Sequence, residues 1–267
     1  MNPSAIETTP KLAIDAGKAR IPAGQRVYAI GDIHGRLDLL EALAHAIELD
    51  AATAPAQSMV LLLGDLIDRG RDSAGVIDYV LAWQERRPVR VLMGNHEEVF
   101  LAAFTDTEYL RRLLPYGARE TLISYGIDAH ITGPDALQRM QAAMASRIPS
   151  RHREFMAALE LSAVIGDYLF VHAGIEPGIP VADQSAQAMR WIRDPFLMHE
   201  GLFEKVVVHG HTIRTEVEER PNRIGIDTGA YCYGLLTALV LEGGERRFIQ
   251  AREQEDGAIA ILHREAA

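Results

Sequence analysis

The sequence predicts an α/β fold, and two observations support this prediction. Strand-like apolar runs alternate with helical repeats between residues 26 and 93. Such a βαβαβ order implies parallel strands joined by right-handed crossovers. Strand patterns return after residue 163, with short turns between the last three. These turns indicate antiparallel or mixed pairing in the second half of the chain.

The first half divides into five elements. The predicted strands are short runs of branched and aliphatic residues, as in buried strands. The predicted helices place apolar residues on one face, such as Leu39, Leu43 and Ile47 in the first helix. Pro88 ends the second helix. In chain order the elements cover residues 26–30 (strand), 36–50 (helix), 58–63 (strand), 73–87 (helix) and 89–93 (strand).

Residues 97–161 have a different character. A helical pattern dominates there, interrupted by glycines and prolines and rich in arginine, and we expect a helical insertion or cap. We expect residues 1–24 to be a mobile leader and residues 25–267 to form a single domain. After the insertion, residues 163–174 resemble a hairpin. Further strands are predicted at residues 205–210, 223–227, 235–242 and 246–251.

The composition is that of an ordinary globular protein, with 48% hydrophobic and 24% charged residues. The formal net charge of −10 disfavours nonspecific binding to nucleic acid and to anionic membranes. The single cysteine, Cys232, excludes an internal disulfide framework. No stretch has the pattern of a signal peptide or approaches the roughly 20 apolar residues that span a bilayer. We therefore expect a cytoplasmic protein without nucleic-acid or membrane partners.

The apolar run at residues 59–63 leads into a charged segment, Gly64-Asp-Leu-Ile-Asp-Arg-Gly70. Charges at the mouth of a buried strand are costly unless something compensates them. One interpretation is a loop that returns to solvent. The other is a metal or phosphate site at the carboxyl end of a parallel strand, where α/β sheets tend to hold ligands. This stretch alone does not decide between them.

Four other predicted strands end in residues of the same kind, which favours the metal or phosphate site. A single aspartate after a strand is a common turn former. Five separate strands that each end in Asp, His or Asn beside a glycine would rarely occur together by chance. The five segments are GDIHG (31–35), GDLIDRG (64–70), GNHE (94–97), VHAG (171–174) and VHGHT (208–212).

The spacing and type of these residues indicate metal binding. Asp32 and His34 are two residues apart, so in an extended segment their side chains point to the same side and can bind one ion. Oxygen and imidazole donors without thiolate suit Mn, Fe or Zn better than a structural zinc site. Six such donors are too many for one catalytic zinc. They fit two ions about 3.5–4 Å apart that share a carboxylate.

The ordered set of motifs resembles the PPP-type metallophosphoesterases. This family includes serine/threonine protein phosphatases, their bacterial and phage relatives, and diadenosine tetraphosphatases. The motifs span residues 31–212 and are specific as a combination. The resemblance implies a calcineurin-like fold, which is a four-layer α/β/β/α sandwich. In this fold two mixed sheets are flanked by helices, and the metals lie at the strand ends.

The resemblance also implies roles for single residues. His211 is favoured over His209 as a ligand because the histidine of the GHT motif binds metal in this family. His96 would be the general acid, Asp68 would orient it, and Arg69 would bind phosphate oxygens. The six metal ligands would be Asp32, His34, Asp65, Asn95, His172 and His211, with Asp65 bridging the two ions.

The late segment MRWIRDPF (189–196) lies where the family has a second phosphate-binding arginine. Arg193 is the candidate and Arg190 the reserve, with an ordinary surface arginine as the alternative. Asp227 is interpreted mainly as part of a structural turn, with a hydrogen bond to backbone or to histidines behind the metal ligands as the alternative. No role is assigned to Tyr231.

The implied function is phosphoester hydrolysis, in which a hydroxide bridging two divalent ions attacks phosphorus in line. Mn²⁺ is the first choice of metal, and Fe, Zn or Ni also fit the donors. The leading substrate is a phosphoprotein carrying phosphoserine or phosphothreonine, with phosphotyrosine left open. The alternative is diadenosine tetraphosphate or another small phosphorylated metabolite. Thr212 is smaller than the usual residue after GH in the diadenosine tetraphosphatases, which favours the phosphoprotein. A noncatalytic scaffold is disfavoured because every expected ligand and the acid are present.

Overall fold

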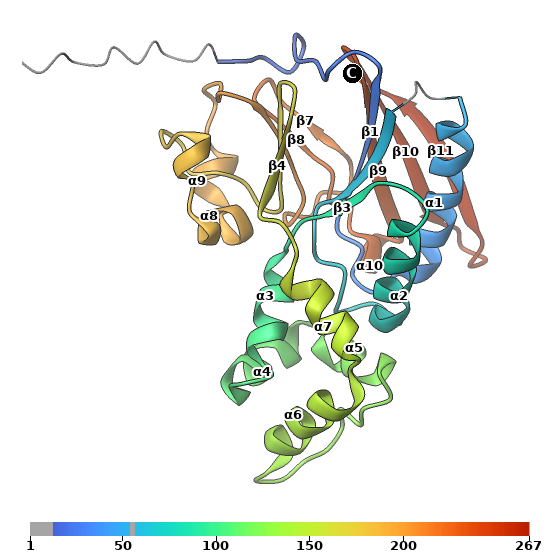
Figure 1. The fold of residues 1–267 in the computed structure, drawn as a ribbon, viewed down its shortest axis with the longest axis vertical. Coiled ribbons are helices and arrows are strands. Elements are labelled where there is room, and N and C mark those ends of the chain that lie inside the picture. Colours follow the sequence, from blue (N-terminus) through green and yellow to red (C-terminus); the bar gives the residue numbers. More distant parts are fainter. Residues whose placement is uncertain (1–12, 54–56, 267) are drawn as a thin grey trace, which may run out of the picture.

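The computed structural model describes residues 13–53 and 57–266. It contains a six-stranded mixed sheet, drawn on the right in Figure 1. The strand order is β11-β10-β9-β1-β2-β3. Strands β1, β2 and β3 pair in parallel, whereas β9, β10 and β11 extend the sheet by antiparallel pairing. The strands are β1 (Gln25–Ile30), β2 (Gln57–Leu62), β3 (Val89–Val91), β9 (Leu235–Glu242), β10 (Glu245–Glu253) and β11 (Ile259–Glu265).

The second sheet has five strands in the order β4-β5-β6-β8-β7. Its central strands β5, β6 and β8 pair in parallel, and the two edge strands are antiparallel to their neighbours. Both sheets are therefore mixed, as predicted. The strands are β4 (Ser162–Ile165), β5 (Tyr168–Val171), β6 (Val206–His209), β7 (Glu218–Glu219) and β8 (Arg223–Gly225).

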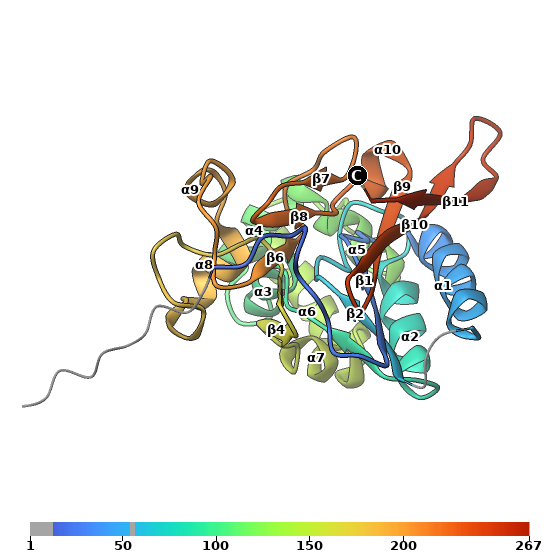
Figure 2. The same cartoon turned by 90° about the horizontal axis from the view of Figure 1, so that it is seen from above.

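The alternating side chains of the strands build a four-layer sandwich. On β1, Val27 and Ala29 belong to the core between the two sheets, whereas Tyr28 and Ile30 pack under the outer helices. Helices α1 (Leu37–Ala51) and α2 (Ser73–Gln84) cover this outer face. Helices α8 (Ala186–Trp191) and α9 (Asp194–Leu197) cover the second sheet on the opposite side of the molecule (Figures 1 and 2). The predicted α/β/β/α architecture is confirmed.

Residues 97–161 contain mainly helices, which extend away from the sheets (Figure 1). Helix α5 lies against α2, so the helical segment stays in contact with the sandwich. The helices here are α3 (Asn95–Ala102), α4 (Thr107–Leu113), the short 3₁₀ turn η1 (Leu114–Tyr116), α5 (Ala118–Ser124), α6 (Ala136–Arg147) and α7 (Ser150–Ala157). The description of this segment as an insertion or cap stays a prediction.

The early elements and the 163–174 hairpin form as predicted, whereas the place of the last strands was not foreseen. Strands β9 and β10 join the first sheet beside β1, and β11, which was not predicted, completes its edge. In the expected leader, residues 1–12 lie outside the described part of the chain. Ala16, Ala19 and Ile21 are buried in the core between the sheets. The boundary at residue 25 stays a prediction.

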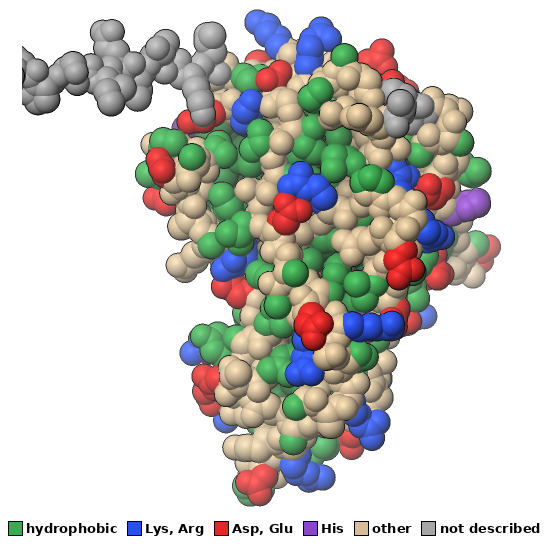
Figure 3. Space-filling view, in the orientation of Figure 1, with side chains coloured by type: hydrophobic (Ala, Val, Ile, Leu, Met, Phe, Trp, Pro, Cys, Tyr) green, Lys and Arg blue, Asp and Glu red, His purple; other side chains and the backbone are tan. Residues whose placement is uncertain are grey.

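Short 3₁₀ and α-helical turns, η2 (Val181–Asp183) and α10 (Ala230–Tyr233), complete the described elements. On the face drawn in Figure 3, acidic and basic side chains are interspersed. Within residues 13–53 and 57–266, no helix is both long and apolar enough to cross a membrane.

Candidate active site

Asp65 lies at the centre of the predicted site, at the end of β2. Its Oδ2 atom is 3.5 Å from Nε2 of His34, and its Oδ1 atom is 3.5 Å from Nε2 of His172. Two groups of buried side chains therefore share this carboxylate. One group is His34, Asp65 and His96, and the other is Asp65, His172 and His211, each with its ligand atoms within 4.8 Å of one another. The structure thus brings together residues from five separate strand ends.

Hydrogen bonds to backbone carbonyls orient two of the histidines. Nδ1 of His34 lies 2.7 Å from the carbonyl oxygen of Ile67, and Nδ1 of His172 lies 2.9 Å from that of Leu63. These contacts place the proton on Nδ1, so Nε2 of each ring turns a lone pair toward Asp65. Burial lowers the pKa of both histidines, which keeps them neutral as metal ligands must be.

The remaining predicted ligands lie around the same point. Oδ1 of Asn95 is 3.0 Å from Nε2 of His172. Asp32 accepts hydrogen bonds of 3.1 and 3.2 Å from the backbone N–H of His211. Burial and the nearby carboxylates of Asp227 and Asp65 raise the pKa of Asp32. Acidic groups are thus held close together out of water, which a bound cation would relieve.

The residues fit a pair of divalent cations on two grounds. Both ring nitrogens of His211 are buried without a hydrogen-bond partner among the described residues, and an unmet buried nitrogen of this kind is suited to a metal. Lone pairs of His34 and His172 also face carboxylate and amide oxygens, so acceptors face acceptors across distances of 3.0–3.5 Å. The donor set contains oxygen and imidazole groups and no thiolate, as predicted for Mn, Fe, Zn or Ni.

Backbone strain is concentrated at the predicted site. Among the described residues, the non-glycine residues with positive φ are all predicted site residues: His34 (47°), Asp65 (48°), Asp68 (72°), Arg69 (71°) and His211 (62°). A conformation of this kind costs roughly 1–3 kcal/mol per residue and persists only where the surroundings enforce it. Two glycines give the carboxylates room, because a Cβ atom at Gly94 would collide with Asp65 and one at Gly210 would collide with Asp32.

Glu97 holds the Asp65 loop in place, a role that the motif alone did not suggest. Its side chain is fully buried. Oε2 accepts hydrogen bonds of 3.0 Å from the backbone N–H groups of Asp65 and Gly94, and Oε1 accepts one of 2.7 Å from Leu66. The carboxylate therefore ties the start of α3 to the loop after β2. Glutamate three residues after a capping glycine is the signal that could have revealed this contact.

The predicted acid and its partner lie together beside Asp65. Nδ1 of His96 is 2.6 Å from Oδ2 of Asp68, which is fully buried. Burial opposes a charge on His96, but the carboxylates of Asp65 and Asp68 outweigh it and raise the pKa of the imidazole. Both ring nitrogens of His96 are occupied, since Nε2 lies 3.1 Å from Nη2 of Arg69. Neither ring nitrogen is therefore free to bind a metal in this arrangement, and the role of His96 as the acid stays a prediction.

A cavity of about 910 Å³ opens above these residues. Four arginines line it, and the predicted ligand Asp65 is the acidic residue in its lining. The guanidinium of Arg69 also lies over the ring of Tyr231, 4.5 Å from its centre. The arginines are Arg69, Arg112, Arg193 and Arg214, and the aromatic residues of the lining besides His96 and His211 are Tyr109, Tyr116, Trp191 and Tyr231.

The structure separates the two arginine candidates of the 189–196 segment. Arg193 lines the cavity, and its Nη1 atom donates a 3.3 Å hydrogen bond to Thr212. Arg190 instead donates a 3.0 Å hydrogen bond from Nε to Glu98 and does not line the cavity. His209 also lies apart from the ligands, since its Nδ1 atom is 3.0 Å from the carbonyl of Gly210 and its ring packs on Phe196.

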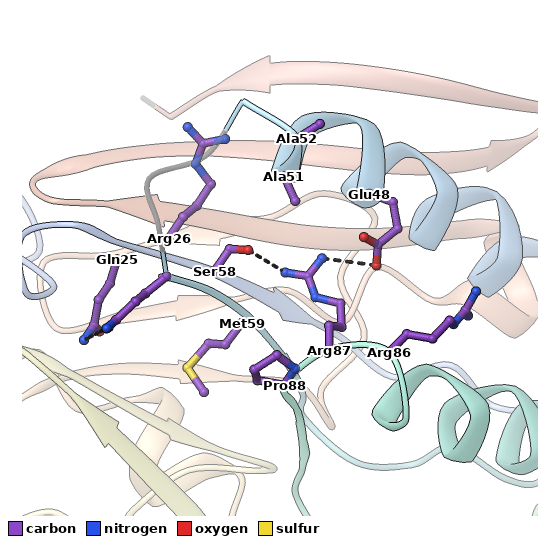
Figure 4. A pocket seen from close by; sticks show the side chains of 11 residues that line it. Gln25, Arg26, Glu48, Ala51, Ala52, Ser58, Met59, Arg86, Arg87 and Pro88 are labelled. Atoms are coloured by element: carbon purple, nitrogen blue, oxygen red, sulfur yellow. Dashed lines mark hydrogen bonds and ion pairs between the residues drawn. The ribbon is translucent and has the colours of Figure 1, made fainter.

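A second cavity, of about 790 Å³, lies at the opposite, amino-terminal ends of β1 and β2 (Figure 4). Arg87 there pairs with Glu48 at 3.1 Å and donates a 2.8 Å hydrogen bond to Ser58. Arg26 is likewise neutralised, by Asp50 at 2.9 Å and by Glu242. Most of the positive charge of this second cavity is therefore compensated by acidic side chains of the protein, in contrast to that of the arginines in the first cavity.

Residues 25–234 match the family model of the calcineurin-like phosphoesterases. This span covers most of the chain and contains all the predicted site residues. The chain belongs to the calcineurin-like phosphoesterase family. Membership supports a hydrolase that uses divalent metals, consistent with the two side-chain clusters around Asp65.

Curated relatives of this phosphoesterase include proteins named bis(5'-nucleosyl)-tetraphosphatase, symmetrical. The one from Shigella dysenteriae serotype 1 is 41% identical over 78 residues, which is 29% of this chain and 26% of that protein. The one from Cellvibrio japonicus is 28% identical over 167 residues, which is 62% of this chain and 51% of that protein. The chain therefore spans about half or less of the length of these relatives.

Two solved structures share the fold of this phosphoesterase. One, provisionally identified as a diadenosine tetraphosphatase, has a TM-score of 0.59 at 21% identity and covers 93% of this chain and 100% of that chain. The other is a cold-active protein tyrosine phosphatase with a TM-score of 0.56 at 18% identity, covering 91% of this chain and 81% of that chain.

Proposed function

We propose that this phosphoesterase hydrolyses phosphomonoesters with poor leaving groups, above all phosphoserine and phosphothreonine in proteins. The observation that carries the proposal is the His96–Asp68 pair, with 2.6 Å between Nδ1 and Oδ2, at the floor of the cavity. A serine or threonine alkoxide is a far poorer leaving group than a nucleotide phosphate, so its departure depends more on a proton donor.

The metal ions would be held by the six predicted ligands. Asp32 and His34 would hold one cation, Asn95, His172 and His211 the other, and Asp65 both. When bound, divalent cations of this kind supply a nucleophile at neutral pH and neutralise charge on the phosphate. Mn²⁺ is our first choice.

The chain's own side chains bind the phosphate and move the leaving-group proton. Arg69 and Arg193 line the cavity and bind the non-bridging phosphate oxygens with their planar guanidinium groups. As the bond between phosphorus and the alkoxide oxygen breaks, Nε2 of His96 gives its proton to that oxygen. Asp68 stabilises the positive charge that His96 carries before this transfer.

A dinucleoside polyphosphate is the second candidate, because the cavity holds more positive charge than one phosphate requires. Arg112 and Arg214 line it in addition to the two arginines named above, and neither has an ion-pair partner among the described residues. Trp191 and Tyr109 on the rim are 42% and 39% exposed, and such rings can stack on nucleotide bases. The names of the relatives from Shigella and Cellvibrio support the same candidate.

Initial rates of the Mn²⁺-loaded protein on two kinds of substrate separate the candidates. Phosphoserine, phosphothreonine and phosphotyrosine peptides are compared with diadenosine tetraphosphate in the same buffer. A kcat/KM about 100-fold higher for the peptides, or about 2.7 kcal/mol in transition-state free energy, would support the phosphoprotein. The same margin for the dinucleotide would overturn it in favour of the second candidate, and turnover of neither would overturn both.

A further inference from the structure

Asp68 depends on two hydroxyl groups from outside its own loop. The residue is fully buried and has a φ of 72°, a conformation that a non-glycine residue keeps only where its surroundings enforce it. Its backbone N–H donates hydrogen bonds of 2.8 Å to Oγ1 of Thr121 and 3.0 Å to Oγ of Ser73. Thr121 belongs to α5, in the helical segment, and Ser73 begins α2.

The protons of this network can be assigned one by one. Thr121 Oγ1 lies 2.6 Å from Oδ1 of Asp68 and donates its single proton to it. Oγ of Ser73 is 2.9 Å from Oγ1 of Thr121, and since the threonine proton is already used, the serine must be the donor. Oδ1 of Asp68 is thus held by Thr121, while Oδ2 remains free to accept from His96.

The same helical segment also holds the neighbour of Asp68. The backbone N–H of Arg69 donates a 3.0 Å hydrogen bond to the carbonyl of Gly117, and its Nε atom lies 3.4 Å from the carbonyl of Tyr116. A Cβ atom at Gly117 would collide with the Arg69 backbone, so these two segments of the chain are in close contact. Residues 116–121 therefore enclose the strained pair Asp68–Arg69 from one side.

We propose that Thr121 is a positioning residue for the general acid. By fixing one carboxylate oxygen of Asp68, it aims the other at Nδ1 of His96 and so sets the direction in which the imidazole presents Nε2. The inference rests on the proposed function, in which His96 protonates the leaving group. It gives the helical segment a part in catalysis, through a contact between residues 53 positions apart in the chain.

Three variants test the role of the hydroxyl. Thr121→Val keeps the shape of the side chain and removes its hydroxyl, and Thr121→Ser restores the hydroxyl. Ser124→Ala is the matched control, because Ser124 lies on the same helix and has no hydrogen bond to Asp68. Its hydroxyl accepts a 3.1 Å hydrogen bond from the N–H of Ala74 and donates one of 2.7 Å to the backbone carbonyl of Thr121. This variant reports on the packing of this helix end against α2 while the Thr121 hydroxyl stays in place.

The first readout is a comparison of leaving groups. We expect Thr121→Val to lower kcat on a phosphoserine peptide by about 10- to 100-fold, and kcat on p-nitrophenyl phosphate by less than about 3-fold, since nitrophenolate leaves without a proton. Thr121→Ser should recover most of the loss, and Ser124→Ala should affect both substrates alike. Equal losses on the two substrates for Thr121→Val, or no loss at all, would overturn the inference.

The second readout needs no turnover. A proton shared between Nδ1 of His96 and a carboxylate gives a far-downfield ¹H resonance, which is recorded on Zn²⁺-loaded protein and assigned by its loss in His96→Asn. We expect this resonance to shift or vanish in Thr121→Val, to persist in Thr121→Ser and to stay unchanged in Ser124→Ala. An unchanged resonance in Thr121→Val would contradict the positioning role. If the wild type cleaved no phosphoserine peptide, the proposed substrate would fail, while this resonance would still decide the role of Thr121.

If Thr121→Val did not fold, Ser73→Ala would carry the same two readouts. Removing the serine takes away the donor that directs the Thr121 hydroxyl toward Asp68. The expected changes have the same direction and are smaller, because Thr121 itself remains. An unchanged resonance together with an unchanged ratio of the two rates would count against the network.

Discussion

The Nη2 atom of Arg69 lies 3.1 Å from the Nε2 atom of His96. A guanidinium group only donates, so Nε2 of the imidazole accepts at this contact and the ring proton lies on Nδ1, toward Asp68. Arg69 and a leaving-group oxygen would compete for the same nitrogen atom. Binding of a phosphate by Arg69 would remove the guanidinium from Nε2 and leave that nitrogen free to take up the proton that it then gives to the leaving group.

Arg69→Ala should lower kcat/KM by roughly 100-fold, because the substrate loses two charge-assisted hydrogen bonds from a planar group. Steady-state kinetics on a phosphoserine peptide measures the loss. Arg111→Ala is the matched control, since Arg111 is exposed on α4, pairs with Glu108 and does not line the cavity. A loss of similar size in both variants would contradict a direct role for Arg69.

His96→Asn should reduce turnover of a phosphoserine peptide by about 100-fold or more, the usual contribution of a general acid. The reduction on p-nitrophenyl phosphate should be far smaller, because its leaving group needs no proton. Metal content, measured by elemental analysis, should stay at the wild-type level. Equal losses on both substrates would show that His96 is not the acid.

Arg193→Ala should raise KM for a phosphopeptide by about 10-fold, as expected when one charge-assisted contact is lost. Arg190→Ala should act mainly on stability, because Arg190 pairs with Glu98 and lies outside the cavity lining. Kinetics and thermal unfolding of the two variants, measured side by side, test this division. The reverse pattern would assign the phosphate contact to Arg190.

Addition of Mn²⁺ to metal-free protein should raise the melting temperature by roughly 5–10 °C at a concentration about 100 times the dissociation constant. His211→Asn should weaken this response, because the histidine places two unpartnered buried nitrogens at the site. His209→Gln should keep the response, since His209 lies against Phe196 and away from Asp65. An unaltered response in His211→Asn would remove His211 from the ligands.

The environment of Asp50, which is not one of the predicted metal ligands, predicts that the stability of the protein depends on pH. Burial alone would raise the pKa of Asp50, but hydrogen bonds from Arg247 and Tyr28 and the charges of Arg247 and Arg26 outweigh it and hold the pKa below its ordinary value. A depressed carboxyl pKa contributes stability above the ordinary value of about 4 and loses it as the pH falls further.

Asp50→Asn should therefore lower the free energy of unfolding by about 1–2 kcal/mol at pH 7, and the difference from wild type should shrink below about pH 4. Urea unfolding at several pH values measures it. Asp183→Asn, at an exposed position, is the control and should show little change. A gap that widens at low pH would contradict the sign.

Strand β1 shows what could be predicted of the fold and what could not. The run Arg26-Val-Tyr-Ala-Ile30 correctly indicated a strand, and the structure buries it on both faces. The pattern does not say which neighbours cover it. The pairing of β1 with β9, between residues more than 200 positions apart, depends on packing along the whole chain, and the late strands were therefore not placed in the first sheet.

The candidate site was predictable where its chemistry is local. The glycine-flanked motifs at five strand ends identified the residues that gather around Asp65. Glu97, although part of a motif, had no predicted role, because its function lies in four backbone contacts that only the folded loop creates. Asp227, expected mainly in a turn, does bond the N–H of Gly229 but also lies beside Asp32.

The sequence by itself determined the types of the chemical groups, their order and their attachment to strand ends, because residue type and short-range turn geometry are local properties. Only the tertiary structure decided which arginine faces the cavity, which late histidine faces Asp65, and that Thr121 holds Asp68. These are contacts between distant parts of the chain. Their distances depend on how sheets and helices pack, and no spacing within a motif encodes that packing.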